Sequence, residues 1–280
     1  MPENHPDKPV YRCVSKPVVP LLVLSLIVLS CASTPAEEPE AEIKLFVAHD
    51  KVSEAKKRVQ DFTKEGLKRH RIYFFDTSSL ELYENARGPV ILRARQKGTK
   101  EPQSTVKFRR TERDPELEQK LRGISSNWEI QTEAVVGQKG GPGISYSLDA
   151  KLGRPLSELD GAGSGRITEW FSPEQKKFLE AAGVDVDWGN LRVFGPIDAD
   201  VWEWKEQDKR VEAKVTAELW PLGDRQIFEL SCKKPGENLA QQIENFVAFF
   251  KDQNILAAEN PQSKTKQALE HFARGTSSQP

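Results

Sequence analysis

The chain has 280 residues, 30% of them charged and 37% hydrophobic, which is enough for one large soluble domain or two small ones. Its 41 basic and 42 acidic side chains give a net charge of −1 at pH 7. Domains that bind nucleic acid usually carry a basic excess, so we expect no nucleic-acid partner.

The first 31 residues resemble the signal of a bacterial lipoprotein. A segment with basic residues precedes an apolar run over 18–29, which is shorter than the ~20 residues of a membrane-spanning helix. The run leads into Val28-Leu29-Ser30-Cys31, which is similar to a lipobox, where such a signal is cut before a lipidated cysteine. The alternative is an uncleaved membrane anchor in which Cys31 has no role.

This pattern predicts four segments along the chain. Residues 1–31 would be a signal peptide ending at lipidated Cys31, 32–39 a polar tether, 40–274 one domain and 275–280 a disordered tail. The domain would lie in the cell envelope, outside the cytoplasm, and would be anchored to a membrane through lipid. Because Ala32 follows the cysteine, we expect the outer membrane.

The cysteines and histidines of the chain indicate neither a disulfide nor a zinc site. Once Cys13 leaves with the signal and Cys31 carries lipid, Cys232 is alone and cannot form an internal disulfide. The four histidines are scattered without the spacing of zinc ligands. The domain must therefore depend on its own apolar core.

Four amphipathic helices are predicted within the domain. Asp50 can cap a first helix whose apolar stripe ends at Phe62, and Ser172 opens a second with a capping box that ends near Gly183. A third begins near Glu237 and a fourth at Ser263. Each presents one apolar face and must pack on an apolar surface.

Short segments of alternating polarity predict the strands, because residues two apart share one face of a strand. In residues 90–95, for example, Arg93 and Arg95 lie opposite Leu92 and Ala94. The alternating segments are 40–45, 90–95, 105–109, 128–133, 210–220 and 227–232. An ordinary antiparallel sheet would expose such polar faces to solvent. Here the polar faces are nearly all charged and helices are available for the apolar faces, which favours a barrel with its charges inside.

Motifs in a fixed order are similar to those of the triphosphate tunnel (CYTH-type) family, from residue 40 to 274. They are Glu40-Ala41-Glu42-Ile43-Lys44, Arg71-Ile72-Tyr73-Phe74-Phe75-Asp76-Thr77, Leu92-Arg93-Ala94-Arg95, Thr105-Val106-Lys107-Phe108-Arg109, Phe228-Glu229-Leu230-Ser231 and Ser263-Lys264. The resemblance implies an α+β fold, an eight-stranded antiparallel β-barrel with a charged interior and helices packed outside. The family includes inorganic triphosphatases, thiamine triphosphatases and some adenylate cyclases.

The resemblance also implies the site residues and a cofactor, Mg²⁺ or Mn²⁺. The metal ligands would be Glu40, Glu42 and Glu229. The groups that bind phosphate would be Lys44, Arg93, Arg95, Lys107, Arg109 and Lys264. The catalytic carboxylates, which would hold the attacking water or a second metal ion, would be Glu129, Glu133 and Glu218.

The acidic half of the motif set is less complete than the basic half. Ser231 stands where active members usually carry a second acid, and Gln131 lacks the charge of the usual acid. The missing acids favour binding without turnover, whereas the near-complete order of the motifs favours hydrolysis. We expect metal-dependent hydrolysis of inorganic triphosphate or short polyphosphate by a membrane-anchored, extracytoplasmic domain. The alternatives are a non-catalytic lipoprotein that binds phosphate chains or another polyanion, and a structural envelope protein that reuses the fold.

Overall fold

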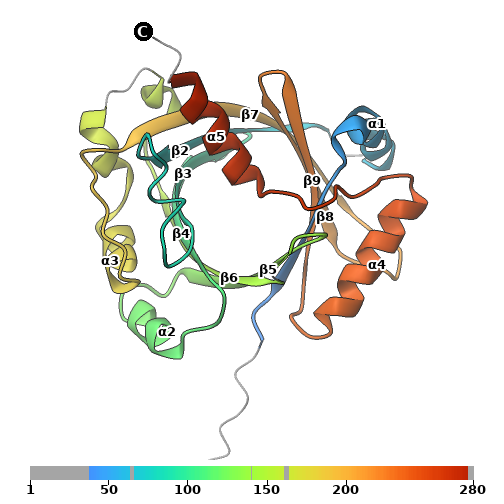
Figure 1. The fold of residues 1–280 in the computed structure, drawn as a ribbon, viewed down its shortest axis with the longest axis horizontal. Coiled ribbons are helices and arrows are strands. Elements are labelled where there is room, and N and C mark those ends of the chain that lie inside the picture. The colour runs from blue at the N-terminus through green and yellow to red at the C-terminus, as the bar shows by residue number, and fades with distance from the viewer. Residues whose placement is uncertain (1–37, 64–65, 140, 161–163, 277–280) are drawn as a thin grey trace, which may run out of the picture. The chain divides into compact units, whose positions relative to one another are not determined.

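The computed structural model describes residues 38–63, 66–139, 141–160 and 164–276 (Figure 1). The predicted signal peptide with Cys31, the tether up to residue 37 and the last four residues of the tail lie outside the described residues. The last helix continues to Thr276, two residues beyond the expected end of the domain. No helix of the described segments has both the length and the apolar character needed to cross a bilayer.

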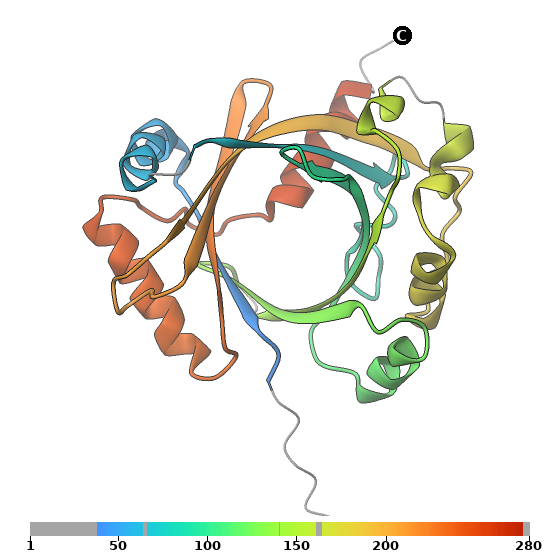
Figure 2. The same cartoon turned by 180° about the vertical axis from the view of Figure 1, so that it is seen from behind.

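Nine strands close into one barrel in the order β1-β5-β6-β4-β3-β2-β7-β8-β9 (Figures 1 and 2). Their bounds are β1 Ala41–Phe46, β2 Lys68–Asp76, β3 Val90–Lys97, β4 Gln103–Arg110, β5 Trp128–Val135, β6 Gly143–Lys151, β7 Arg192–Lys205, β8 Lys214–Leu222 and β9 Arg225–Lys234. The barrel agrees with the sequence-based expectation, but its strand number does not.

The expected eight antiparallel strands are wrong in number and in one pairing. β1 pairs with β5 in parallel, and the other neighbours in the barrel of the described chain are antiparallel. Strand directions can alternate all the way round a closed sheet only if the number of strands is even. A nine-stranded barrel must therefore contain a parallel pair.

Five α-helices and three 3₁₀ helices accompany the barrel. The α-helices are α1 Val52–Phe62, α2 Pro115–Arg122, α3 Pro173–Ala181, α4 Leu239–Asp252 and α5 Lys264–Thr276, and the 3₁₀ helices are η1 His49–Lys51, η2 Leu156–Leu159 and η3 Ser164–Trp170. The capping box of α3 is confirmed, because Ser172 Oγ accepts from the Gln175 amide and Gln175 Oε1 accepts from the Ser172 amide. Asp50 does not cap α1, since it lies within η1. Helix α2 was not predicted.

The apolar faces of the strands point outward and are covered by helices. α3 contacts β4 and β6, where Phe108 packs between Tyr146 and Phe178. α1 and α4 cover β1, β8 and β9, and Trp202 and Trp204 pack in this second core. Burial of these side chains contributes about 25 cal/mol per Å² of apolar surface.

One end of the barrel interior is apolar and carries α5 (Figures 1 and 2). Phe46, Phe74 and Trp220 belong to a buried cluster that also contains Ala268 and Leu269 of α5. The cluster fills the interior at this end, so the charged part of the interior rests on an apolar floor.

Candidate functional site

A cavity of about 670 Å³ occupies the charged part of the barrel interior. It brings together residues from all nine strands of the barrel and from α5, as the alternation of polar and apolar residues requires. The proposed site residues that line it are Glu40, Glu42, Lys44, Arg93, Arg95, Lys107, Arg109, Glu129, Glu218, Glu229 and Lys264. Glu133 lies behind this lining, where it holds three cations.

Three cations follow one another along β3 on the cavity side: Arg93, Arg95 and Lys97. Throughout the described chain, none of the three lies within ion-pairing distance of a carboxylate. Arg93 donates to Thr105 Oγ1 at 3.2 Å, while its Nε is buried without a hydrogen-bond acceptor. This row of cations therefore lacks the direct ion pairs that buried charges normally have, and the carboxylates of Asp149 and Glu218 act on Arg93 and Lys97 only from a greater distance.

The pKa values of Arg93 and Lys97 are lowered by burial and by the neighbouring cations. Burial and the charge of Arg95 lower the pKa of Arg93 to about 10. Burial, with the charges of Arg95 and Arg93, lowers the pKa of Lys97 to about 8. An anion placed against this row would relieve both effects.

Lys97 was not predicted as a site residue, although the alternation of polar and apolar residues along this segment indicated it. The predicted strand stopped at residue 95, whereas β3 runs to Lys97. Extending the alternation of Arg93 and Arg95 by two residues places Lys97 on the same face.

On β5, which β6 and β4 separate from β3, Glu133 pairs with three other cations. Its carboxylate lies 2.7 Å from Lys107 Nζ, 2.8 Å from Arg109 Nη2 and 3.4 Å from Lys44 Nζ, and Lys44 is also 2.8 Å from Glu42. Burial alone would raise the pKa of Glu133, but the three cations outweigh it and hold the pKa well below its usual value. The geometry thus pairs Glu133 with cations rather than aiming it into the cavity.

The third group is built around Lys264 at the start of α5. Its Nζ lies 2.5 Å from Glu218 Oε2 and 2.7 Å from Glu229 Oε1. Burial lowers the pKa of Lys264, but the two carboxylates outweigh it and raise the pKa above its usual value. His70 Nδ1 lies 3.8 Å from Glu218, and burial lowers the pKa of His70 to about 4, so this histidine is neutral at pH 7.

Asp76 is a structural residue at the edge of this region. Its carboxylate accepts hydrogen bonds from the amides of Thr77, Leu82 and Tyr83. Asp76 therefore stabilises the turn that follows β2.

Two solved structures share this architecture. HpAC1 from Hippeastrum, described as having a dominant triphosphatase activity, superposes with a TM-score of 0.54 and 14% identity over 84% of this chain and 96% of its own. A Bacillus halodurans protein described as a candidate adenylate cyclase superposes with a TM-score of 0.51 and 13% identity over 82% of this chain and 97% of its own. The chain has a CYTH-like fold. No protein-family model and no curated protein matches its sequence.

The carboxylates of this CYTH-like barrel do not fit a resident divalent metal in the observed arrangement. Within the described residues, no group of three or more His, Cys, Asp and Glu side chains is placed to hold a metal ion. Mg²⁺ and Mn²⁺ need several oxygen ligands. Here Glu42 is paired with Lys44, and Glu218 and Glu229 are both paired with Lys264.

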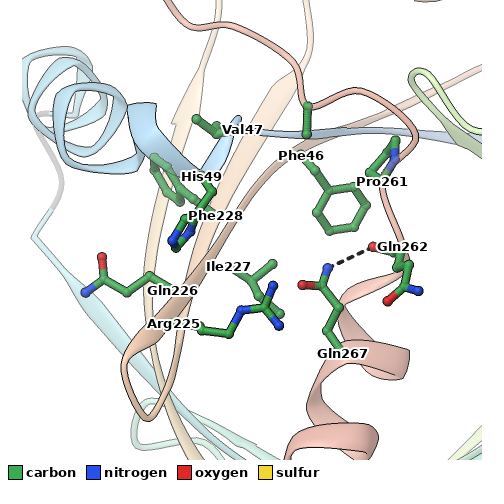
Figure 3. A pocket seen from close by; sticks show the side chains of 11 residues that line it. Phe46, Val47, His49, Arg225, Gln226, Ile227, Phe228, Pro261, Gln262 and Gln267 are labelled. Atoms are coloured by element: carbon green, nitrogen blue, oxygen red, sulfur yellow. Dashed lines mark hydrogen bonds between the residues drawn. The ribbon is translucent and has the colours of Figure 1, made fainter.

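A second, smaller cavity of about 270 Å³ lies outside the charged interior (Figure 3). Its lining includes Phe46, His49, Ile227 and Gln267 but no carboxylate, and Gln267 Nε2 donates to the Gln262 carbonyl at 3.0 Å. None of the proposed site residues lies in this lining, so the charged cavity remains the candidate site of the CYTH-like barrel.

Proposed function

We propose that the charged cavity binds the phosphate chain of inorganic triphosphate or a short polyphosphate. The observation that carries this proposal is the row of Arg93, Arg95 and Lys97. In the described chain no carboxylate lies within ion-pairing distance of these three side chains, and Arg93 Nε is buried without an acceptor. A guanidinium binds two phosphate oxygens with its planar fork, and an ammonium attracts them as a point charge.

The spacing of the row favours a chain of phosphates over a single phosphate. Residues two apart on a strand are separated by about 7 Å, so Arg93 and Lys97 are about 14 Å apart along β3. One phosphate group cannot reach both ends of the row, whereas a linked chain can contact it at several points.

Calorimetric titration of the full-length protein with tripolyphosphate, pyrophosphate and orthophosphate tests the proposal. We expect affinity to rise with chain length, and to fall about 100-fold in an Arg93→Gln/Arg95→Gln variant, because two charge-assisted contacts are lost. An Arg69→Gln/Arg122→Gln variant removes the same charge from exposed side chains outside the cavity and should bind as the wild type does. Equal loss in both variants would reject the site.

Hydrolysis of the bound chain is the second candidate function. It is supported by the carboxylates Glu42 and Glu129, which line the same cavity as the cations, and by the likeness to HpAC1, described as mainly a triphosphatase. Phosphate release from tripolyphosphate, measured with Mg²⁺, with Mn²⁺ and with a chelator, tests it. Release that disappears in Glu42→Gln/Glu229→Gln establishes an enzyme, and tight binding without release establishes a capture protein.

For location, we propose a lipid-anchored, extracytoplasmic protein. The support comes from the sequence alone, from the apolar run over 18–29 and the lipobox-like segment that ends at Cys31. In that location inorganic phosphate chains are more suitable ligands than nucleotides, which belong to the cytoplasm.

A further inference from the structure

The carboxylates of Glu218 and Glu229 form a cation site between two neighbouring strands. The two residues are direct partners in the β8–β9 ladder, and both side chains point into the cavity. Glu218 Oε2 also accepts a hydrogen bond from Trp220 Nε1 at 3.2 Å. Two buried carboxylates on directly opposed residues repel each other unless a cation lies between them.

The ammonium of Lys264 occupies this site. It contacts one oxygen of each carboxylate and lies over the Trp220 ring, 4.8 Å from the ring centroid. The lysine side chain is only 18% exposed. A cation shared by two carboxylates and an aromatic face is held on three sides.

The start of α5, which carries Lys264, is held in place by hydrogen bonds and by packing. Ser263 Oγ lies 2.7 Å from the Tyr83 hydroxyl and accepts a hydrogen bond from the Lys266 amide. One turn further on, Ala268 and Leu269 are buried in the apolar floor. The backbone at Lys264 is therefore fixed close to the two carboxylates.

We propose that Lys264 takes the place of a divalent metal in this barrel, so that the cavity binds a phosphate chain without Mg²⁺ or Mn²⁺. This inference rests on the proposed binding of phosphate chains. A divalent ion between Glu218 and Glu229 would stand within contact distance of the ammonium and be repelled by it.

Two further positions that could supply ligands to such a metal bring none. Ser231, two residues after Glu229 on the same strand face, brings no charge. Glu42 is paired with Lys44. An ammonium has three donors, and Lys264 uses two of them on carboxylates. The third donor is available to a phosphate oxygen in the cavity.

Two measurements on the full-length protein test this inference. The first is a titration with Mn²⁺ in the absence of phosphate, in which the electron paramagnetic resonance signal reports the concentration of free Mn²⁺. The second is the affinity for tripolyphosphate, measured once in buffer with a chelator and once in buffer with Mn²⁺. The two affinities are compared at equal concentrations of free tripolyphosphate. We expect no Mn²⁺ bound at concentrations up to ~10⁻⁴ M, where weak carboxylate sites begin to fill. We also expect the tripolyphosphate affinity to be the same in both conditions within experimental error.

A matched pair of variants separates the ammonium from the helix that carries it. Lys264→Met keeps the chain length but frees both carboxylates, and we expect it to bind Mn²⁺ and to require Mn²⁺ for tripolyphosphate binding. Lys266→Met removes an ammonium from the same helix, where its partners are Glu84 and Glu270, and should behave as the wild type. Thermal melting shows whether Lys264→Met is folded, and the wild-type measurements decide the question if it is not.

The outcomes distinguish this inference from the proposed function. Wild-type protein that binds Mn²⁺ at one ion per chain, or that binds tripolyphosphate only with Mn²⁺, overturns the role of Lys264 and leaves phosphate binding in place. Wild-type protein that binds no tripolyphosphate in either condition overturns the proposed function and this inference with it.

Discussion

Lys107 Nζ lies 2.7 Å from Glu133 Oε1, although their strands, β4 and β5, are separated by β6. The two side chains meet because β6 places Gly143, Ser145 and Ser147 on the cavity side at this level. These small residues leave room for long side chains to reach across the strand. The same space admits Arg109 to the carboxylate of Glu133.

Replacing Glu133 with glutamine should destabilise the fold and spare phosphate binding. The side chain is 6% exposed, and its loss would leave Lys44, Lys107 and Arg109 close together without their shared carboxylate. Breaking a buried ion pair on one side typically costs about 3–5 kcal/mol. Urea unfolding should show this loss, and tripolyphosphate, which would supply the missing negative charge, should bind at least as tightly as to the wild type.

The control for this prediction is Glu158→Gln, which removes an exposed carboxylate from outside the barrel. Unchanged stability of Glu133→Gln, or complete loss of tripolyphosphate binding by a folded variant, would contradict the charge-balancing role of Glu133.

The pKa of about 8 for Lys97 predicts two opposite pH dependences. Its usual value is 10.5, so between pH 8 and 10.5 the unfolded chain binds the proton more tightly than the folded one. The stability of the free protein should therefore rise with pH across this window. The affinity for tripolyphosphate should fall across the same window, because deprotonated Lys97 no longer attracts the bound anion.

Both dependences should be weaker in Lys97→Met, which has no proton to lose. Thermal melting and calorimetry between pH 7 and 10.5 measure them, and Lys100→Met, an exposed lysine three residues away, serves as the matched control. If Lys97→Met and the wild type have parallel pH profiles, Lys97 does not titrate in this window.

Gln175 should contribute to stability without affecting the cavity. Its buried amide donates to the carbonyls of Ser104 and Leu148 and accepts from Ser104 Oγ and the Ser172 amide, which ties α3 to β4 and β6. Gln175→Ala removes these bonds and leaves buried groups unpaired, at about 1–3 kcal/mol for each group left unsatisfied. Denaturation should reveal the loss while tripolyphosphate affinity is unchanged. A large change in affinity would show that α3 positions the cavity wall.

Cys31 should carry the lipid anchor. Incorporation of labelled palmitate by bacteria that express the full chain should be abolished by Cys31→Ala, and the protein should then leave the membrane fraction. Cys13→Ala is the control, because this residue would be removed with the signal peptide. Wild-type protein that incorporates no label but stays in the membrane fraction would point to an uncleaved anchor instead.

The alternation of residues was sufficient to predict most of the barrel wall. Arg93 and Arg95 opposite Leu92 and Ala94 specify a strand with one charged and one apolar face, and the structure places those faces inside and outside the barrel. The predicted strand over 210–220 begins only at Lys214, because the preceding residues form a turn in which Arg210 pairs with Asp208 and Asp252.

Strands β6 and β7 were harder to predict for a local reason. The cavity face of β6 carries Gly143, Ser145 and Ser147 before the charged residue Asp149, so it lacks the run of charges that marked the other strands. β7 contains Gly195 and Pro196, which interrupt the regular alternation and usually indicate a turn. The expected number of eight antiparallel strands came from the family resemblance, and the parallel β1–β5 pair could not be anticipated from short-range patterns.

The sequence by itself determined which side chains enter the cavity, because a period of two residues assigns each side chain to one face of its strand. Only the tertiary structure decided which charges neutralise one another. Lys264 meets Glu218 and Glu229, which are 46 and 35 positions away, because α5 docks on the apolar floor of the barrel. Glu133 meets three cations because β5 closes the barrel beside β1. The cations left over, Arg93, Arg95 and Lys97, mark the side of the cavity where an anion is needed.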